Sequence, residues 1–280
     1  MGAVWLHDQL IMRKFQEFTG DTPVVQITKR LIDQYLGERS KEIMKSSVNV
    51  ELRHLKAALT KAVDWNYLPE NPAKGLKPLQ VPVSAPRFFT ETQAQTILSA
   101  IDFEPMKEIV IFAVNTGARL GEVLNVRWMD IDSYRKTVRI AQTETFSTKT
   151  KRERTIPLND SVYDLLAGME RRGEYVFCRL NGRQRDKHWV SRKFKSILVS
   201  IGLGKGYSFH SLRHTFASWL VQKGVSIYKV SKLLGHSNVK TTEIYAYLAP
   251  ETFHPEVNLL DYENPRDRVV EMMEEAGRAT

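Results

Sequence analysis

Cysteine is almost absent from this sequence, and its scarcity removes two kinds of chemistry. Cys178 is the single cysteine among 280 residues, so neither an internal disulfide nor a metal site built from several thiolates can form. Its neighbours Val176 and Phe177 are apolar. This run predicts a buried strand, in which the thiol is structural rather than reactive.

Long hydrophobic runs are missing as well. The longest apolar stretches, such as residues 109–114, fall far short of the ~20 residues that cross a bilayer. The N-terminus lacks the design of a signal peptide, and Leu6 stands where a myristoylation signal has serine or threonine. We therefore expect a cytoplasmic protein with no membrane partner.

Repeats and low-complexity tracts do not occur, and the composition is that of a folded protein. Hydrophobic residues make up 42% of the chain and charged residues 26%, values that exclude a disordered or fibrous protein. Because a domain usually takes ~100–200 residues, a chain of 280 residues predicts two domains.

Positive charge is in excess and unevenly distributed. Lysine and arginine number 41, against 32 aspartate and glutamate, for a formal charge of +9. Residues 251–280 hold eight acidic and three basic side chains, so the preceding chain carries 38 basic against 24 acidic groups, or +14. A basic body of this kind favours a polyanionic partner such as nucleic acid.

The spacing of apolar residues predicts how the chain is divided. Residues 26–71 repeat apolar side chains every three or four positions, as helices do. Residues 77–86 hold three prolines and show no period, which is typical of an extended linker. The sequence therefore predicts four segments: a helical domain with a short N-terminal extension over 1–76, a linker over 77–87, a second domain over 88–250 and a tail over 251–280.

The second domain is predicted to begin with helices and to continue with strands. Residues 90–93 have the form of a capping box that opens a helix, and a further helix over 107–115 ends at the Thr-Gly pair 116–117. Residues 137–141 and 154–158 have strand character and predict a β-hairpin around a cationic loop. The expected fold is mainly α with a small antiparallel β-sheet.

Four polar side chains stand out as candidates in this second domain. His210 and Arg213 lie three residues apart, on one face of a predicted helix. Arg119 lies among glycines, where a guanidinium has room to bind a phosphate or carboxylate. Lys149 lies in the hairpin loop. Considered singly, each is more typical of a core hydrogen bond, an ion pair or a solvated surface.

Two more candidates follow near residue 240. His236 comes after Gly235, which is predicted to end a helix in the left-handed conformation. Tyr245 lies in a predicted short helix over 243–248, with Thr242 as its N-cap. A histidine at a helix end and a half-buried tyrosine are ordinary structural features when each is taken alone.

Taken together, these residues resemble the tyrosine recombinase (phage integrase) family. Its boxes appear in order: Thr-Gly-Ala-Arg-Leu-Gly-Glu at 116–122, Ser-Thr-Lys-Thr at 147–150, His-Ser-Leu-Arg-His-Thr-Phe at 210–216, and Leu-Gly-His at 234–236 followed by Tyr245. The resemblance extends over residues 25–250, and it implies a two-domain DNA clamp. In that clamp a helical, SAM-like core-binding domain joins a mixed α/β catalytic domain.

The resemblance also implies which residues handle the phosphate. Arg119 and Arg213 would hold the non-bridging oxygens of the scissile phosphate, and His210 and His236 would add hydrogen bonds. Glu122 would be a supporting residue that orients its neighbours. Independently of the family, a phosphodiester is anionic, and two arginines neutralise the charge that spreads over its oxygens in the transition state. This chemistry requires neither a metal nor another cofactor.

By the same resemblance, Tyr245 would be the nucleophile and Lys149 the general acid that protonates the leaving 5′ oxygen. A phenol with a pKa of ~10 attacks poorly at neutral pH, so it depends on nearby positive charge and on loss of its proton. The product would be a 3′-phosphotyrosine ester, which is rejoined to another DNA end without ATP. Tyr247 stands where the family often has histidine, and it is an alternative nucleophile.

The implied function is site-specific recombination, in which strands are exchanged through a Holliday junction. The expected partners are double-stranded DNA with an inverted-repeat core site, three further copies of the chain in a tetramer on DNA, and accessory DNA-bending proteins. The tail over residues 251–280 would dock on the neighbouring protomer. Two other functions stay open: DNA relaxation by a type IB topoisomerase, and site-specific binding by a regulator without activity.

Overall fold

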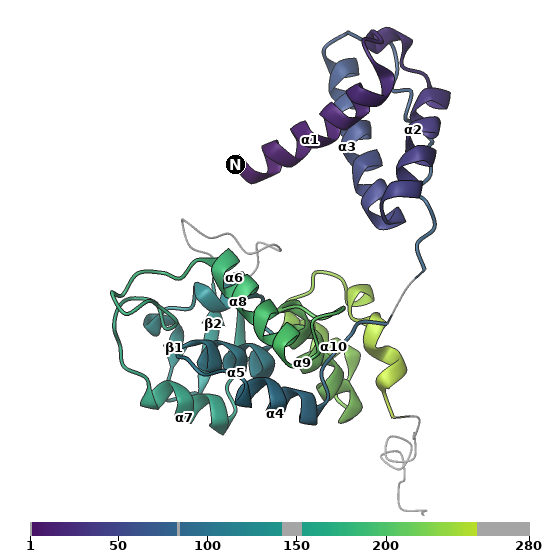
Figure 1. Ribbon diagram of the computed structural model, residues 1–280. Coiled ribbons are helices and arrows are strands. Elements are labelled where there is room, and N and C mark those ends of the chain that lie inside the picture. The colour runs from purple at the N-terminus through teal and green to yellow at the C-terminus, as the bar shows by residue number, and fades with distance from the viewer. Residues whose placement is uncertain (1, 83–84, 142–152, 251–280) are drawn as a thin grey trace, which may run out of the picture. The chain divides into compact units, whose positions relative to one another are not determined.

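The computed structural model describes residues 2–82, 85–141 and 153–250, with no side chains described for residues 2–7. The chain divides into two compact units, one ending at Ser84 and the other beginning at Ala85. The first unit is entirely helical over its described residues, whereas the second combines helices with one small sheet (Figure 1). The predicted fold class, mainly α with a small antiparallel sheet, is confirmed.

The first unit consists of three α-helices and one 3-10 turn, whose bounds are α1 Gly2–Thr19, η1 Val24–Gln26, α2 Lys29–Glu42 and α3 Lys45–Asp64. The predicted N-terminal extension thus contains a helix of 18 residues. Thr28 is the N-cap of α2, and its hydroxyl accepts a hydrogen bond from the Leu31 amide. Buried side chains of α2 and α3, among them Ile32 and Leu55, form the core of this unit.

A buried carboxylate joins α2 to α3. Glu51 accepts two hydrogen bonds from Arg39, at 3.0 Å from Nε and 2.7 Å from Nη2, and a third at 2.8 Å from the Tyr35 hydroxyl. A buried charge is stable only when it is paired and hydrogen-bonded in this way. The three side chains therefore form an internal cross-link between the two helices.

The second unit is built mainly from helices, with the following bounds: α4 Glu91–Ser99, α5 Met106–Thr116, α6 Leu120–Leu124, η2 Trp128–Asp130, α7 Asp160–Gly168, α8 Lys187–Ser200, α9 His210–Gln222, α10 Ile227–Leu234, η3 Val239–Thr241 and η4 Glu243–Leu248. Thr90 and Gln93 make both hydrogen bonds of the predicted capping box at the start of α4. The predicted helix ends at Gly117 and Gly235 are also confirmed, because both residues are left-handed.

The sheet of the second unit has three antiparallel strands in the order β1 Ile131–Asp132, β2 Thr137–Ile140 and β3 Arg154–Pro157. Strands β2 and β3 pair from Thr137 with Pro157 to Ile140 with Arg154, which confirms the predicted hairpin. The loop that joins them, and with it Lys149, lies outside the described residues. The predicted tail over 251–280 also lies outside them.

Two local predictions need correction. Val176 and Phe177 are buried, as is Cys178, but they form a turn between two isolated bridges instead of a strand. Burial of consecutive apolar residues does not by itself specify an extended backbone. Helix η4 has the predicted bounds but is a 3-10 helix, and the Thr242 side chain does not cap it because that hydroxyl bonds to His236.

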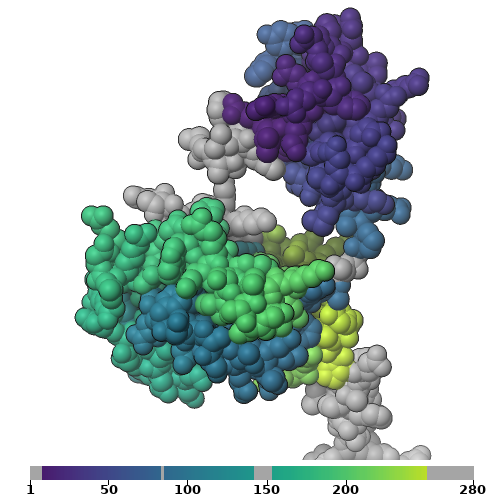
Figure 2. Space-filling model, viewed as in Figure 1, coloured from purple at the N-terminus to yellow at the C-terminus, as the bar shows by residue number. Residues whose placement is uncertain are grey.

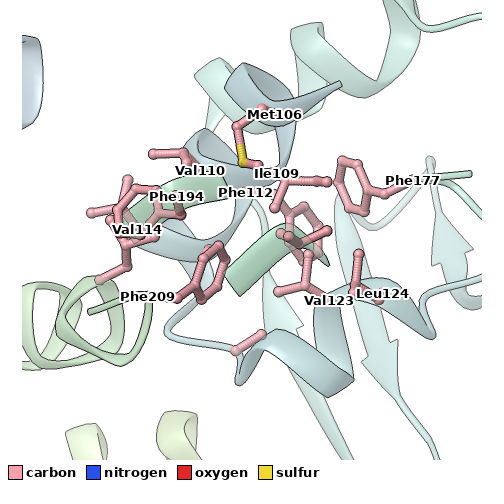
Figure 3. Close-up of a cluster of buried hydrophobic side chains, with 14 of the residues drawn as sticks. Met106, Ile109, Val110, Phe112, Val114, Val123, Leu124, Phe177, Phe194 and Phe209 are labelled. Carbon is pink, nitrogen blue, oxygen red and sulfur yellow. The ribbon is translucent and has the colours of Figure 1, made fainter. Parts of the chain in front are cut away.

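Helix α5 supplies much of the hydrophobic core of the second unit. Its side chains Met106, Ile109 and Phe112 meet aromatic rings that come from elsewhere in the chain (Figure 3). Phe112 and Phe177 pack edge to face, with ring centroids 5.1 Å apart. Helix α9 packs against α5, so the turn after α5 is held next to the middle of α9.

At the surface of this unit, residues around 180–200, drawn in green, cover part of the face that Figure 2 presents. They include α8, which exposes several basic side chains: Lys187, Arg192, Lys193 and Lys195. None of the helices in the described part of the chain combines the length and hydropathy of a membrane span.

Candidate active site

The turn after α5 places Arg119 at the start of α6. Gly117 ends α5 with φ +62°, a conformation that favours glycine. A Cβ atom at this position would lie 2.4 Å from Cδ1 of Phe216, so glycine also allows α9 to approach. Two residues later, Arg119 occupies the N-cap position of α6 with its side chain partly exposed.

Glu122 fixes the orientation of Arg119. Its carboxylate accepts hydrogen bonds from the Arg119 amide at 2.9 Å and from Arg119 Nη1 at 2.8 Å. Arg154 of β3 binds the same carboxylate at 2.7 Å through Nη2 and at 3.3 Å through Nη1. Burial alone raises the pKa of Glu122, but the hydrogen bonds and charge of Arg154, with those of Arg119, bring it down to about 2. Glu122 is therefore ionised at neutral pH.

Arg213 lies in the interior between two helix ends. It is 2% exposed, and it donates hydrogen bonds of 2.7 Å to the carbonyl oxygens of Gly117 and Leu234, the ends of α5 and α10. Burial, and then the charge of Arg119, lower the pKa of its guanidinium to about 9, so it stays positively charged at neutral pH. Arg213 has five N–H donors, and these two bonds leave further donors for a ligand.

His236 follows the left-handed Gly235 and is held by the next turn of chain. Its Nδ1 lies 2.8 Å from the Thr242 hydroxyl, which leaves Nε2 as the second hydrogen-bonding atom of the ring. Burial, followed by the charges of Arg213, Arg119 and Arg154, lowers the pKa of His236 to about 4. The ring is therefore neutral at pH 7.

Three of the predicted residues line a single pocket of about 360 Å³: Arg119, His210 and Arg213. His210 is the first residue of α9 and is exposed, whereas Arg213 is buried one turn further on. Lys187 and Ser191 of α8 line the pocket as well. The charges of Arg119 and Arg213 also act on His236. Fixed cations thus gather around one basin, which suits an anionic ligand of phosphate type.

Tyr245, on η4, does not line this pocket and is buried instead in a hydrophobic cluster with side chains of α9 and α10. It is 2% exposed and packs with Phe216, Val230 and Leu234. Its hydroxyl lies 2.7 Å from Nδ1 of His214, on α9. Burial raises the pKa of Tyr245 to about 12, although the positive charge of Arg213 acts in the opposite direction. The neighbouring Tyr247 is exposed by 58%.

The site contains three residues to which the sequence analysis assigned no role: Arg154, Lys187 and His214. His214 lies four residues after His210 on the same helix, and this spacing alone places the two rings on one face. Arg154 and Lys187 carry no comparable signal, because their roles depend on contacts with distant segments. Within the described ranges, no group of three or more histidine, cysteine or acidic side chains is arranged to hold a metal ion.

Comparisons with known proteins agree with this arrangement. The model of the phage integrase family matches residues 87–252. The integrase of Escherichia phage P2 is 30% identical over 247 residues, which span 88% of this chain and 68% of that protein. The XerC-like tyrosine recombinase of Caldanaerobacter subterraneus subsp. tengcongensis is 29% identical over an alignment that covers 81% of this chain and 68% of that protein.

Solved structures share the fold. The Tn1549 transposon integrase in complex with a circular intermediate DNA has a TM-score of 0.75 and 19% identity, over 93% of both chains. A lambda integrase tetramer bound to a Holliday junction has a TM-score of 0.69 and 21% identity, over 85% of this chain and 72% of that chain. The family match and the relatives together lead to one conclusion: this chain belongs to the phage integrase family of tyrosine site-specific recombinases.

Proposed function

We propose that this chain cleaves and rejoins DNA at specific sites through a 3′-phosphotyrosine intermediate. The observation that carries the proposal is the shared pocket of Arg119, His210 and Arg213, with Tyr245 on the adjoining element η4. In this mechanism the phenolic oxygen of Tyr245 attacks the scissile phosphorus, and the 5′ oxygen leaves. Lys149 protonates that oxygen as the general acid.

The charge distribution around the pocket supports this chemistry. Arg119, Arg154 and Arg213 bring three positive charges, and Glu122 neutralises one of them. Arg119 and Arg213 would hold the non-bridging oxygens, and the two histidines, His210 and His236, would donate hydrogen bonds. Because these donors are fixed before the reaction, they stabilise developing negative charge without reorganising. We therefore expect cleavage to proceed in EDTA and without ATP.

The folded units have separate tasks in this proposal. The helical unit, with residues 1–76, is the core-binding domain, residues 77–87 are the linker, and residues 88–250 form the catalytic domain. Together they clamp a duplex with an inverted-repeat core site, and phosphate contacts make binding steeply dependent on salt. The basic charge of the chain before residue 251 supports this partner.

Recombination by this mechanism requires four active sites on one synaptic complex. We propose a homotetramer that passes through a Holliday junction, with the tail over 251–280 docked on the neighbouring protomer and with accessory DNA-bending proteins that set the direction. A lambda integrase whose fold matches this chain has been solved as a tetramer bound to a Holliday junction, which supports the proposed tetramer and junction. The cell compartment we propose is the cytoplasm, where the protein meets DNA.

The nucleophile is tested with a substrate that traps the intermediate. A binding site is first selected from random-sequence DNA and then built into a duplex that loses a short fragment on cleavage, so that rejoining is prevented. The wild type and Tyr247→Phe should form a covalent protein–DNA complex that survives SDS, whereas Tyr245→Phe should form none. Covalent complexes with Tyr245→Phe would overturn the assignment.

The same substrate separates the proposed function from its alternatives. Exchange of strands between two duplexes is expected of a recombinase, whereas a type IB topoisomerase would nick and close plasmids without exchange. A regulator without activity would bind the selected site and form no covalent complex. Either of these results would contradict site-specific recombination by this chain.

A further inference from the structure

His214 makes the one described hydrogen bond to the phenolic oxygen of Tyr245, at 2.7 Å through Nδ1. It is part of the box His-Ser-Leu-Arg-His-Thr-Phe, but none of the roles implied by the family resemblance falls on it. It follows Arg213 directly on α9 and lies four residues after His210. The rings of His210 and His214 meet edge to face with centroids 4.8 Å apart.

The surroundings of His214 and Tyr245 keep both side chains uncharged at neutral pH. Burial, and then the charge of Arg213, lower the pKa of His214, while the pKa of Tyr245 is raised to about 12. At neutral pH both groups are therefore neutral, and the phenol donates to Nδ1 in the tautomer whose proton is on Nε2. The titratable and charged groups that face this pair are His210 and Arg213 on α9, and Tyr247 on η4.

His236, a further histidine next to the cations, is engaged elsewhere. Nδ1 of His236 bonds to the Thr242 hydroxyl at 2.8 Å. A phenol that attacks phosphorus must lose its proton to a group within hydrogen-bond reach, about 2.6–3.2 Å. His214 meets this requirement in the structure as it stands.

We propose, on the basis of the function proposed above, that His214 is the proton acceptor that activates Tyr245. As the bond from the Tyr245 oxygen to phosphorus forms, the phenolic proton passes to Nδ1 of His214, which becomes an imidazolium. The bond between phosphorus and the 5′ oxygen breaks, its electron pair leaves with that oxygen, and the general acid Lys149 protonates it. On rejoining, each proton returns along the same path.

The location of His214 on α9 explains how the contact persists when DNA binds. Tyr245 is buried in this structure, so η4 must shift for the phenol to meet a phosphate. That phosphate is bound by Arg213 and His210, which are carried by the same helix as His214. Because the His214 ring contacts the His210 ring one turn earlier, a phenol that reaches a phosphate bound by His210 stays near His214.

Two substitutions separate proton transfer from mere positioning. His214→Asn retains an acceptor atom near the position of Nδ1 but cannot take up a proton at neutral pH, and His214→Phe retains the ring without an acceptor. Both are measured in the full-length protein by single-turnover formation of the covalent complex on the trapping substrate. Thermal unfolding checks that each variant folds, and Tyr247→Phe is the control for a change next to the nucleophile.

We expect both His214 variants to form the complex about 10²-fold more slowly than the wild type, within the range that general bases contribute. The wild-type rate should be level between pH 7 and 9, because the base is already neutral. In His214→Asn the rate should instead rise by about tenfold per pH unit, since hydroxide then removes the proton.

A wild-type rate and a level pH profile in His214→Asn would overturn the proposal, because an acceptor that only positions the phenol is restored by asparagine. If His214→Phe does not fold, the asparagine variant decides by itself. Tyr245→Phe is run in parallel. If Tyr245→Phe forms no complex and His214→Asn forms it at the wild-type rate, only the role of His214 is rejected. If Tyr245→Phe still forms the complex, the proposed nucleophile is rejected.

Discussion

Over the described residues, each unit of this protein buries one tyrosine whose hydroxyl bonds to a titratable side chain, and the two partners differ. Tyr35 is 1% exposed and donates to the carboxylate of Glu51, whereas Tyr245 is 2% exposed and bonds to the imidazole of His214. Burial raises the pKa of both phenols. The anion Glu51 raises the pKa of Tyr35 further and outweighs the opposite effect of Arg39, whereas the cation Arg213 lowers the pKa of Tyr245. Two equally buried phenols therefore differ in how readily they lose a proton. Glu51 opposes that loss in Tyr35, whereas Arg213 favours it in Tyr245.

The buried carboxylates of the two units differ in a related way. Glu51 is bound by Arg39, whose side chain is itself buried and also pairs with the exposed Glu42 of the same helical unit. Glu122 is bound by Arg154, which is buried, and by Arg119, whose side chain is 22% exposed and lines the pocket. The pairing of glutamate with arginine links two helices in the first unit. In the second unit it orients Arg119, which lines the pocket.

The largest effect on cleavage is expected when one buried arginine is replaced in each unit and the two variants are compared. Arg213→Gln should lower the rate of covalent complex formation by about 10³-fold, because a fixed positive charge at the phosphate is lost. Arg39→Gln should leave that rate unchanged in the folded protein, since Arg39 lies in the helical unit. Single-turnover cleavage, normalised to the folded fraction, measures both. Equal losses in the two variants would show that the contrast between the pairs is wrong.

A smaller effect is expected when each carboxylate is removed. Glu51→Ala should lower the stability of the first unit by about 3 kcal/mol, because Arg39 loses its buried counter-charge but keeps the exposed Glu42. Glu122→Ala should destabilise the second unit by about 3–5 kcal/mol, because Arg154 is left buried without a counter-charge, and it should also slow cleavage because Arg119 is no longer oriented. Hydrogen exchange read peptide by peptide reports the two units separately. Loss of protection in the first unit of Glu122→Ala would contradict this prediction.

The smallest effect concerns pH. His236 has a pKa of about 4 in the folded state, below the ~6.5 of an unfolded chain. Its contribution to stability is therefore complete above pH 6.5 and is lost as the pH falls towards 4. Glu51 and Glu122, whose pKa values are also lowered, lose theirs only below about pH 4.5.

Lowering the pH from 7 to 5 should thus destabilise the second unit by about 1 kcal/mol, a value reduced because His236 is half-buried. The first unit should change less. Hydrogen exchange at the two pH values, corrected for intrinsic exchange, measures the difference, and His236→Gln should reduce it, with the remainder coming from His214, whose pKa is also lowered. An equal change in both units would argue against this role of His236.

Much of the local structure was predictable because it depends on neighbouring residues. Thr90 and Gln93 form the capping box that their spacing predicts, and Gly117 and Gly235 end helices where the apolar pattern stops. The hairpin from β2 to β3 followed from alternating side chains. The turn at Val176 and Phe177 was not predictable, because its burial comes from packing against distant elements such as Phe112.

The candidate site shows the same division. Arg119, His210 and Arg213 were identified from short motifs, and the structure brings them to one pocket. Arg154 and His214 were missed as site residues, since their partners lie 32 and 31 residues away in the sequence. The roles of Lys149 and of the tail over 251–280 stay predictions, since both lie outside the described residues.

The sequence by itself determined the helices, the hairpin, the family and the order of the charged residues, because these depend on spacing along the chain. Only the tertiary structure decided that Glu122 is shared by Arg119 and Arg154 and that the hydroxyl of Tyr245 meets His214. Such contacts arise when α9, β3 and η4 pack together. The order of residues along the chain does not encode the distances between atoms that packing brings together.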